Sequence, residues 1–323
     1  MDATGPAAAP PPDDGSLRVL SSRRDLDAPE LAPYVTLTDA ALRRAADAEH
    51  GVFLAESTPV VRRALEAGCL PRSFLVPRRY LEAVEDLLAA HPETPVFTGE
   101  DEVLTALTGF HLHRGALAAM ERPAPRSVGS LFEHARRVLV AEDLTDPTNL
   151  GAIVRSAVAL GWDALLLSPR AADPLYRRAV RVSMGTVFRL PWARAAAWPG
   201  DASDGGGGTE AEDGAGATPM AAASPAVPEP APDGLEQLKE AGFAVVALEV
   251  TDQAVDLDDA LLAPVRHAER LALVVGAEGP GVRPETLALC DAHVKIPMPA
   301  GVDSLNVGAA AAVALWELRS RPV

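Results

Sequence analysis

Aromatic residues, cysteines and long apolar runs are all scarce in this sequence. Only 4% of its 323 residues are aromatic although 48% are hydrophobic, so alanine, leucine and valine must fill the interior. The two cysteines, Cys69 and Cys290, lie far apart in apolar surroundings, which predicts buried thiols and indicates neither a disulfide framework nor a metal site. No run approaches the ~20 apolar residues that span a bilayer, and the N-terminal sequence lacks the basic and apolar parts of a signal peptide. We therefore expect a cytoplasmic protein with no membrane partner and no bound metal.

Positive charge is also in deficit, because the formal net charge is −16. A nucleic-acid partner normally requires a basic surface, so the global charge argues against one. The deficit is uneven, however. Residues 1–200 hold 25 acidic and 22 basic side chains, whereas residues 201–323 hold 20 and 7. The arginines of the first part occur mostly in adjacent pairs, so a local basic surface is compatible with an acidic protein.

The chain is long enough for two domains with cores of their own. Residues 1–16 are rich in proline, alanine and aspartate, which predicts a disordered tail. Residues 17–122 then alternate between apolar strands and amphipathic helices and predict a small α/β domain. Its expected strands are 51–55, 73–76, 95–98 and 116–120, and its expected helices are 40–48, 57–68, 80–90 and 100–107.

Residues 123–323 predict a second α/β domain, in which short apolar strands and helices imply a parallel sheet with helices on both faces. A Gly/Ala/Pro/Asp-rich stretch at 200–233 cannot bury enough apolar surface to fold and predicts a disordered acidic insert. The expected strands are 138–141, 164–167, 186–190, 243–248, 271–275 and 292–296, and the expected helices are 147–160, 174–182, 234–241, one after 284 and a C-terminal one.

The first stretch that can carry chemistry is 143–155, which follows the first strand of the second domain. Asp146 with Pro147 behind it is a strong helix start. Asn149 then falls in the first helical turn, and Arg155 falls off the apolar stripe. In isolation they indicate a turn residue and an exposed helix charge, but ligands gather at the carboxyl ends of parallel strands, which makes both residues candidates.

The second stretch is 271–282, where an apolar strand runs into a glycine-rich turn that holds one carboxylate, Glu278. The glycine spacing fits neither a Walker loop nor the Gly-x-Gly-x-x-Gly fingerprint. The glycine-rich turn is better explained by a backbone that approaches a flat or bulky ligand closely than by a phosphate-binding loop. A sharp turn with positive φ would also explain the glycines, although it would not explain Glu278.

The third stretch is 294–317, where a strand ends at Pro297, crosses a short loop and enters a helix through Asp303 or Ser304. The loop offers unpaired backbone groups, and Ser304 and Asn306 add a hydroxyl and an amide at the helix start. An ordinary strand-to-helix connection is the alternative interpretation.

Taken together and in this order, the three stretches closely resemble the motifs of the SpoU-type (TrmH family) RNA ribose methyltransferases of the SPOUT superfamily, over nearly all of residues 35–320. The resemblance implies a C-terminal trefoil-knotted methyltransferase domain preceded by a small RNA substrate-binding domain, with S-adenosylmethionine as cofactor. It also implies a homodimer, which suits the small residues from Gly308 to Ala312 in the C-terminal helix. The insert at 200–233 departs from the family pattern but falls away from all three motifs.

The resemblance also implies roles for single residues. Arg155 would clamp the phosphate beside the reacting ribose, because a guanidinium holds its proton too firmly to act as a base. Asn149, Ser304 and Asn306 would position the ribose, and Glu278 would orient Arg155 or brace its loop. The expected cofactor contacts are Leu248, Val275, Gly276, Ala277, Gly281, Ile296, Met298 and Leu305. The expected RNA contacts are Arg72, Arg78, His113 and Arg114, although such residues can also simply decorate a surface.

Within this family, an extra domain favours ribosomal RNA over transfer RNA as the substrate. A tRNA 2′-O-methyltransferase and a catalytically silent RNA-binding protein of the same fold are the alternatives. A nucleotide-dependent oxidoreductase would share the fold class, but the sequence lacks its glycine fingerprint and its ribose-binding acid.

Overall fold

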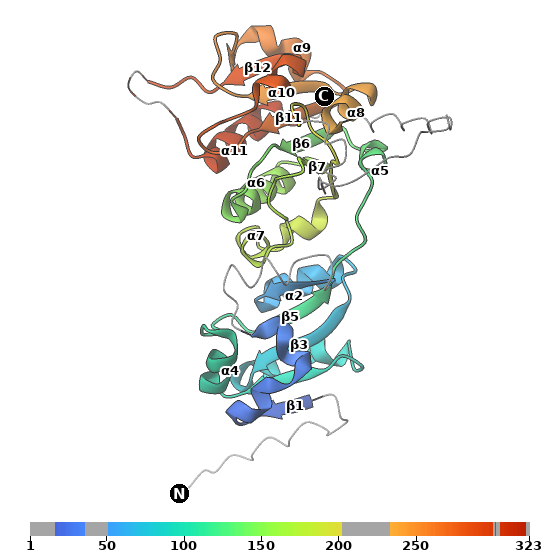
Figure 1. The fold of residues 1–323 in the computed structure, drawn as a ribbon, viewed down its shortest axis with the longest axis vertical. Coiled ribbons are helices and arrows are strands. Elements are labelled where there is room, and N and C mark those ends of the chain that lie inside the picture. Colours follow the sequence, from blue (N-terminus) through green and yellow to red (C-terminus); the bar gives the residue numbers. More distant parts are fainter. Residues whose placement is uncertain (1–16, 36–50, 202–232, 300, 302–303, 321–323) are drawn as a thin grey trace, which may run out of the picture.

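The computed structural model describes residues 17–35, 51–201, 233–299, 301 and 304–320. The expected tail at 1–16, the expected helix at 40–48 and nearly all of the expected insert lie outside the described residues. Within them, the chain forms two α/β units, each built on its own sheet, and the units follow one another along the long axis of the molecule (Figure 1).

The first unit contains a five-stranded mixed sheet with the order β1-β4-β3-β5-β2. Strand β5 runs antiparallel to β2 and β3, whereas β1, β4 and β3 are parallel. The strands are β1 Leu17–Leu20, β2 Val52–Glu56, β3 Pro71–Pro77, β4 Val96–Gly99 and β5 Leu117–Glu121. The α-helices are α2 Thr58–Glu66, α3 Glu85–Ala89 and α4 Asp101–Thr108.

Two features of this unit differ from the sequence prediction. Strand β1 was not predicted, because only one of its four residues is buried and it has no apolar alternation. The expected helix at 80–90 is broken into the short 3-10 helices Arg78–Tyr80 and Glu82–Val84 followed by α3. The four strands after residue 51 and the helices α2 and α4 confirm their predictions.

The second unit contains a seven-stranded sheet with the order β10-β12-β9-β11-β6-β7-β8, and every pairing in it is parallel. Its strands are β6 Arg137–Ala141, β7 Ala164–Leu167, β8 Trp192–Arg194, β9 Ala244–Leu248, β10 Val255–Asp256, β11 Leu271–Val275 and β12 Ala292–Lys295. Its α-helices are α5 Val128–Phe132, α6 Pro147–Ala159, α7 Arg177–Val182, α8 Gly234–Glu240, α9 Ala263–Arg266, α10 Pro284–Leu289 and α11 Val307–Leu318.

Helices cover both faces of this sheet, as the sequence predicted. In the central strand β11, Leu273 and Val275 belong to one apolar cluster, whereas Ala272 and Val274 belong to another. Successive side chains of a strand point to opposite faces, so a strand buried on both sides is apolar throughout. The α/β fold class with a parallel sheet is therefore confirmed, while the knotted path stays a prediction.

The expected strand at 186–190 is wrong. Residues Thr186–Arg189 form a 3-10 helix, and the edge strand β8 begins only at Trp192. The reason is local. Gly185 adopts a left-handed conformation with φ of 75°, and the Thr186 hydroxyl donates a hydrogen bond to the Ser183 carbonyl, so the chain turns before it can extend.

The two units are held together where α7 and the 3-10 helix Thr186–Arg189 meet β2 and α2. Arg177 donates to the carboxylate of Glu56 at 2.8 Å, and Arg63 donates to the carbonyl of Met184. The rings of Phe53 and Phe188 lie 5.4 Å apart across the same junction. One apolar cluster includes residues of both units, so their cores are continuous. The domain boundary expected between residues 122 and 123 stays a prediction.

Both thiols are half-buried rather than buried, which corrects the sequence prediction. Desolvation raises the pKa of both, that of Cys290 to about 12. In the described part of the chain, no helix is long and apolar enough to cross a bilayer. No group of three or more potential metal ligands occurs among those same residues.

Candidate active site

A cavity of about 470 Å³ lies at the carboxyl ends of the adjacent strands β9, β11 and β12. Parallel strands end at one edge of their sheet, so loops far apart in the sequence meet there. The end of β9 and the glycine-rich turn after β11 contribute the predicted cofactor contacts Leu248, Val275, Gly276, Ala277 and Gly281. The segment after β12 contributes Ile296, Met298 and Leu305. The structure therefore places all eight residues around one cavity.

The turn after β11 is folded tightly on itself. The amide of Gly281 donates to the carbonyl of Ala277 at 3.0 Å, and Gly281 has a φ of 72°. A Cβ atom on Gly276 would lie 2.3 Å from the carbonyl carbon of Gly281. The glycine at 276 is thus required by the turn's own backbone, and the one at 281 by its positive φ. Close approach of a ligand, which the sequence favoured, is not needed to explain either glycine.

The side-chain amide of Asn306 joins the three motif stretches at the edge of this cavity. Its nitrogen donates to Glu278 at 3.1 Å and, at 3.4 Å, to the amide oxygen of Asn149. Its oxygen accepts a hydrogen bond from the backbone of Gly308 at 3.0 Å. Three residues predicted from separate motifs are therefore brought into contact, and Glu278 contacts Asn306 rather than Arg155.

The C-terminal helix begins later than the sequence predicted. Asn306 is the N-cap of α11, whose first residue is Val307, so Ser304 precedes the helix and Asp303 lies outside the described residues. Asparagine caps a helix as well as aspartate or serine does, and here its side-chain oxygen binds the second helical amide. Ser304 and Asn306 nevertheless both line the cavity, as does Glu278.

Arg155 is the one predicted catalytic residue that the structure separates from this cluster. It is exposed, does not line the cavity, and has no hydrogen bond or ion pair with any described residue. The geometry of α6 explains why. The six residues from Asn149 to Arg155 rotate the helix by about 600° and advance it by about 9 Å, so the two side chains point in different directions.

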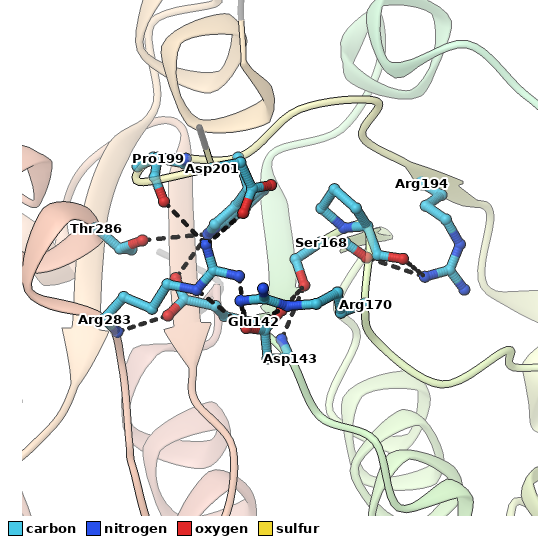
Figure 2. A network of polar contacts seen from close by, with 11 residues as sticks. Glu142, Asp143, Ser168, Arg170, Arg194, Pro199, Asp201, Arg283 and Thr286 are labelled. Atoms are coloured by element: carbon cyan, nitrogen blue, oxygen red, sulfur yellow. Dashed lines mark hydrogen bonds and ion pairs between the residues drawn. The ribbon is translucent and has the colours of Figure 1, made fainter. Parts of the chain in front are cut away.

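A network of polar contacts joins the residues that follow β6 to Arg283 in the loop after β11 (Figure 2). Glu142, which follows β6, is fully buried and accepts hydrogen bonds from the indole of Trp198 at 2.7 Å and from the amide of Arg283 at 2.6 Å. Desolvation raises the pKa of Glu142, and hydrogen bonds from Thr286 and Trp198 offset part of that rise. The buried carboxyl thereby joins the end of β6 to the segments that carry Trp198 and Arg283.

Asp143 is the second carboxylate of this network and lies beside Glu142 in Figure 2. It adopts a φ of 50° and accepts from the guanidinium of Arg283 at 2.6 Å, from Arg170 at 2.7 Å and from the Ser168 hydroxyl at 2.8 Å. Arg283 also reaches Asp201 at 2.8 Å. Arg283, in the loop after β11, is thus bound to the loop that precedes α6.

Sequence reasoning missed Glu142, Asp143 and Arg283, and it also missed Glu249 at the end of β9. The Glu249 carboxylate lines the cavity and accepts from the amide of Val282 at 2.8 Å. The available signal was the position of Glu142 and Glu249, each an acid directly after an apolar strand. Their partners lie 141 and 33 residues away, which no local pattern reveals.

The predicted RNA contacts are all exposed on the first unit but do not form one site. Arg78 lies 3.4 Å from Glu100, and Arg72 lies 3.5 Å from Glu121. His113 stacks on His111 with ring centroids 5.4 Å apart. The Tyr80 hydroxyl donates to the carbonyl of His113, which places Arg78, His113 and Arg114 near one another. Arg72 lies at the other end of β3 from Arg78.

A parallel α/β sheet with a cavity at adjacent strand ends, walled by apolar side chains and a glycine turn, is the arrangement by which α/β proteins bind a small molecule. The chain belongs to the SpoU rRNA Methylase family, whose model matches residues 136–201 and 225–316. It is therefore an RNA methyltransferase by family.

The similar proteins include both curated sequences and solved structures. An uncharacterized tRNA/rRNA methyltransferase of Mycobacterium tuberculosis is 38% identical over 294 residues, which cover 91% of this chain and 89% of that protein. The 23S rRNA (guanosine(2553)-2′-O)-methyltransferase RlmP of Bacillus subtilis is 24% identical, with 83% and 88% covered. The crystal structure of an AdoMet-bound rRNA methyltransferase from Sinorhizobium meliloti matches with a TM-score of 0.70 at 21% identity, covering 94% of this chain and 98% of that one.

Proposed function

We propose that this protein transfers a methyl group from S-adenosylmethionine to a ribose 2′-hydroxyl of ribosomal RNA in the cytoplasm. The observation that carries the proposal is the convergence of Asn149, Glu278 and Asn306 at one end of the strand-end cavity. The relative RlmP, which is named for 2′-O-methylation of 23S rRNA, supports both the reaction and the choice of ribosomal over transfer RNA.

The cavity fits the expected cofactor in size and chemistry. Its volume of about 470 Å³ lies within the range of small-molecule sites, and its walls combine apolar side chains with backbone groups of the glycine turn. Val275, Ile296 and Leu305 would hold the adenosyl part, and Glu249 and Glu278 supply the negative charge that suits a sulfonium. When bound, S-adenosylmethionine supplies an electrophilic methyl group. The relative from Sinorhizobium meliloti, which holds AdoMet, supports this assignment.

The 2′-hydroxyl must be positioned and its developing negative charge stabilised, because a neutral hydroxyl is a poor nucleophile. We assign the positioning to Asn149, Ser304 and Asn306, whose polar groups lie at or next to the cavity. Arg155 would bind the neighbouring phosphate and stabilise the alkoxide. A guanidinium stays protonated at neutral pH, so it acts as a clamp and not as the base.

The exposed position of Arg155 leads us to propose that the enzyme is a homodimer in which this arginine enters the partner's site. Helix α6 packs closely against α11, where a Cβ atom on Gly308 would lie 3.6 Å from the side chain of Ala152. On the outer side of α11, Val313 and Trp316 are about half exposed, which provides apolar surface for a second copy.

The test of Arg155 is the substitution Arg155→Lys, with Arg136→Lys as a control at an exposed arginine outside the cavity. Transfer of a tritiated methyl group to RNA from cells lacking the gene should fall at least 100-fold in R155K, because a lysine cannot make the bidentate phosphate contact. Affinity for S-adenosylmethionine, measured by calorimetry, should not change. Wild-type turnover in R155K would refute the role.

Subunit complementation tests the dimer. Protomers that carry Arg155→Ala are mixed, after partial unfolding and refolding, with protomers that carry Gly276→Ala in the cavity wall. If the arginine acts across the interface, mixed dimers keep one intact site and the mixture recovers about a quarter of wild-type activity. If the arginine acts within its own chain, no mixed dimer is active and the mixture transfers no methyl group.

A further inference from the structure

A second cavity, of about 610 Å³, lies where the two α/β units meet and shares no residue with the strand-end cavity. Its walls come from the end of α2, from the connector at 122–126 between the units, and from the chain between 169 and 194. That last stretch ends in β8, the edge strand farthest in the sheet order from β10 and β12. The cavity is therefore a separate site, next to the opposite edge strand of the sheet.

The walls of this junction cavity are strongly basic, although the protein as a whole has a net charge of −16. They carry Arg122, Arg126, Arg189 and Arg194 and a single carboxylate, Asp173. Asp173 forms an ion pair with Arg122, in which both side chains are largely buried. Three positive charges thus remain without a neutralising partner in the wall.

Two arginine side chains of the cavity are available to an anion. Arg126 and Arg189 are exposed and form no hydrogen bond or ion pair with the described residues. Nη1 of Arg122 is buried and has no hydrogen-bond partner among the residues that the structure describes. Because this nitrogen has almost no accessible surface, the exposed guanidinium groups of Arg126 and Arg189 are the donors that an anion in the cavity can reach.

Aromatic surface lies beside these donors. Trp192 and Tyr176 both line the cavity and are partly exposed. Arginines that bind phosphate next to aromatic rings that stack on bases are the combination by which proteins hold single-stranded nucleic acid. A free mononucleotide offers the same chemistry with one phosphate, whereas an RNA strand offers successive phosphates to Arg126 and Arg189.

We propose that the junction cavity binds a single-stranded segment of the substrate RNA, with Arg126 and Arg189 on its phosphates and Trp192 against a base. The proposal rests on the proposed function, because it concerns the same RNA. It adds a binding surface on the connector between the units, apart from the predicted contacts on the first unit. Since the site lies away from the strand-end cavity, it acts on RNA affinity and not on cofactor affinity.

The test compares the double variant R126A/R189A with the control R18A/R136A, which removes the same charge from exposed arginines outside both cavities. Binding of a labelled fragment of 23S rRNA is measured between 50 and 200 mM salt. Loss of two single-strand phosphate contacts should lower the salt slope, which is the slope of log affinity against log salt concentration, by about 1.4. The fall in affinity between 50 and 200 mM salt should therefore be about seven-fold smaller for R126A/R189A than for the wild type. The control should keep the wild-type slope.

The aromatic contact is tested separately with Trp192→Ala and Trp192→Phe. W192A should weaken RNA binding about ten-fold without changing the salt slope, and W192F, which keeps a stacking ring, should restore most of it. Because Trp192 also packs on the core, the arginine variants keep the proposal falsifiable if W192A does not fold. A free mononucleotide should bind far more weakly than the RNA fragment and should not compete at equal concentration.

Equal RNA affinity and equal salt slope in R126A/R189A and in the control would overturn the proposal. Competition by a free mononucleotide at equal concentration would also overturn it, since the cavity would then serve a small ligand. Failure of the proposed function has a different signature, because wild-type protein would then bind S-adenosylmethionine and RNA fragments without transferring a methyl group.

Discussion

The substitution Gly276→Ala tests whether the glycine turn after β11 shapes the cofactor cavity. The new Cβ atom would lie 2.3 Å from the carbonyl carbon of Gly281 and 2.4 Å from the amide nitrogen of Val282. Both neighbours are backbone atoms and cannot swing aside as a side chain would. The turn must therefore open by about 1 Å before the contact reaches an ordinary van der Waals distance of about 3.5 Å.

Opening the turn by this amount breaks two hydrogen bonds. One joins the Gly281 amide to the Ala277 carbonyl at 3.0 Å, and the other joins the Val282 amide to the Glu249 carboxylate at 2.8 Å. A neutral hydrogen bond contributes about 1 kcal/mol and one to a charged group about 1.5–3 kcal/mol, so the native turn becomes less favourable by about 2–4 kcal/mol. If cofactor binding requires that native turn, affinity falls about 30- to 1000-fold.

The assay is calorimetric titration with S-adenosylmethionine, together with thermal unfolding followed by circular dichroism. The control is Gly129→Ala in α5, where a Cβ atom meets nothing within 4 Å and φ is not positive. G129A should bind the cofactor as the wild type does. Wild-type affinity in G276A would refute the reasoning, because it would show that the turn's closed form is not needed for binding.

Two further variants test buried polar groups. Burial raises the pKa of Glu142 above 4.5, so the folded state binds the extra proton and stability is lost as pH rises through the folded pKa. The melting temperature of the wild type relative to Glu142→Gln should therefore fall between pH 4 and pH 8, and parallel melting curves would refute this. Tyr34→Phe should cost about 1–3 kcal/mol in guanidinium unfolding, because it leaves the buried Ala119 amide and Ser73 carbonyl without the hydroxyl at 3.0 and 2.8 Å. An unchanged midpoint and slope would contradict that expectation.

The apolar strands were predictable because burial on both faces leaves an uninterrupted hydrophobic run, as in β11. The edge strand β1 was not, since its pairing with β4 depends on backbone contacts that leave no pattern in its side chains. The same limit applies to Gly151. It belongs to the first motif, yet its packing role follows only from the structure, where a Cβ atom would lie 2.6 Å from the Ala179 carbonyl of α7.

The candidate site was predictable in some of its members, although Glu249 was missed, and it was not predictable in its geometry. The order and spacing of three motifs singled out Asn149, Glu278 and Asn306, and the structure joins them through one amide group. The place of Arg155 off the apolar stripe of α6 predicted an exposed side chain, and the structure confirms that it is exposed. Its separation from the cavity could not be predicted, because that depends on where α6 lies relative to β9, β11 and β12.

Long-range hydrogen bonds connect the loops around the cavity to one another. Arg283 binds Glu142 and Asp143 and so ties the turn after β11 to the loop before α6. Glu249 ties the same turn to the end of β9, and Asn306 ties the start of α11 to Glu278 and Asn149. Binding a ligand to loops already fixed in this way avoids the entropy of ordering them. Substitutions at Arg283, which does not line the cavity, should therefore weaken cofactor binding even though they leave every cofactor contact in place.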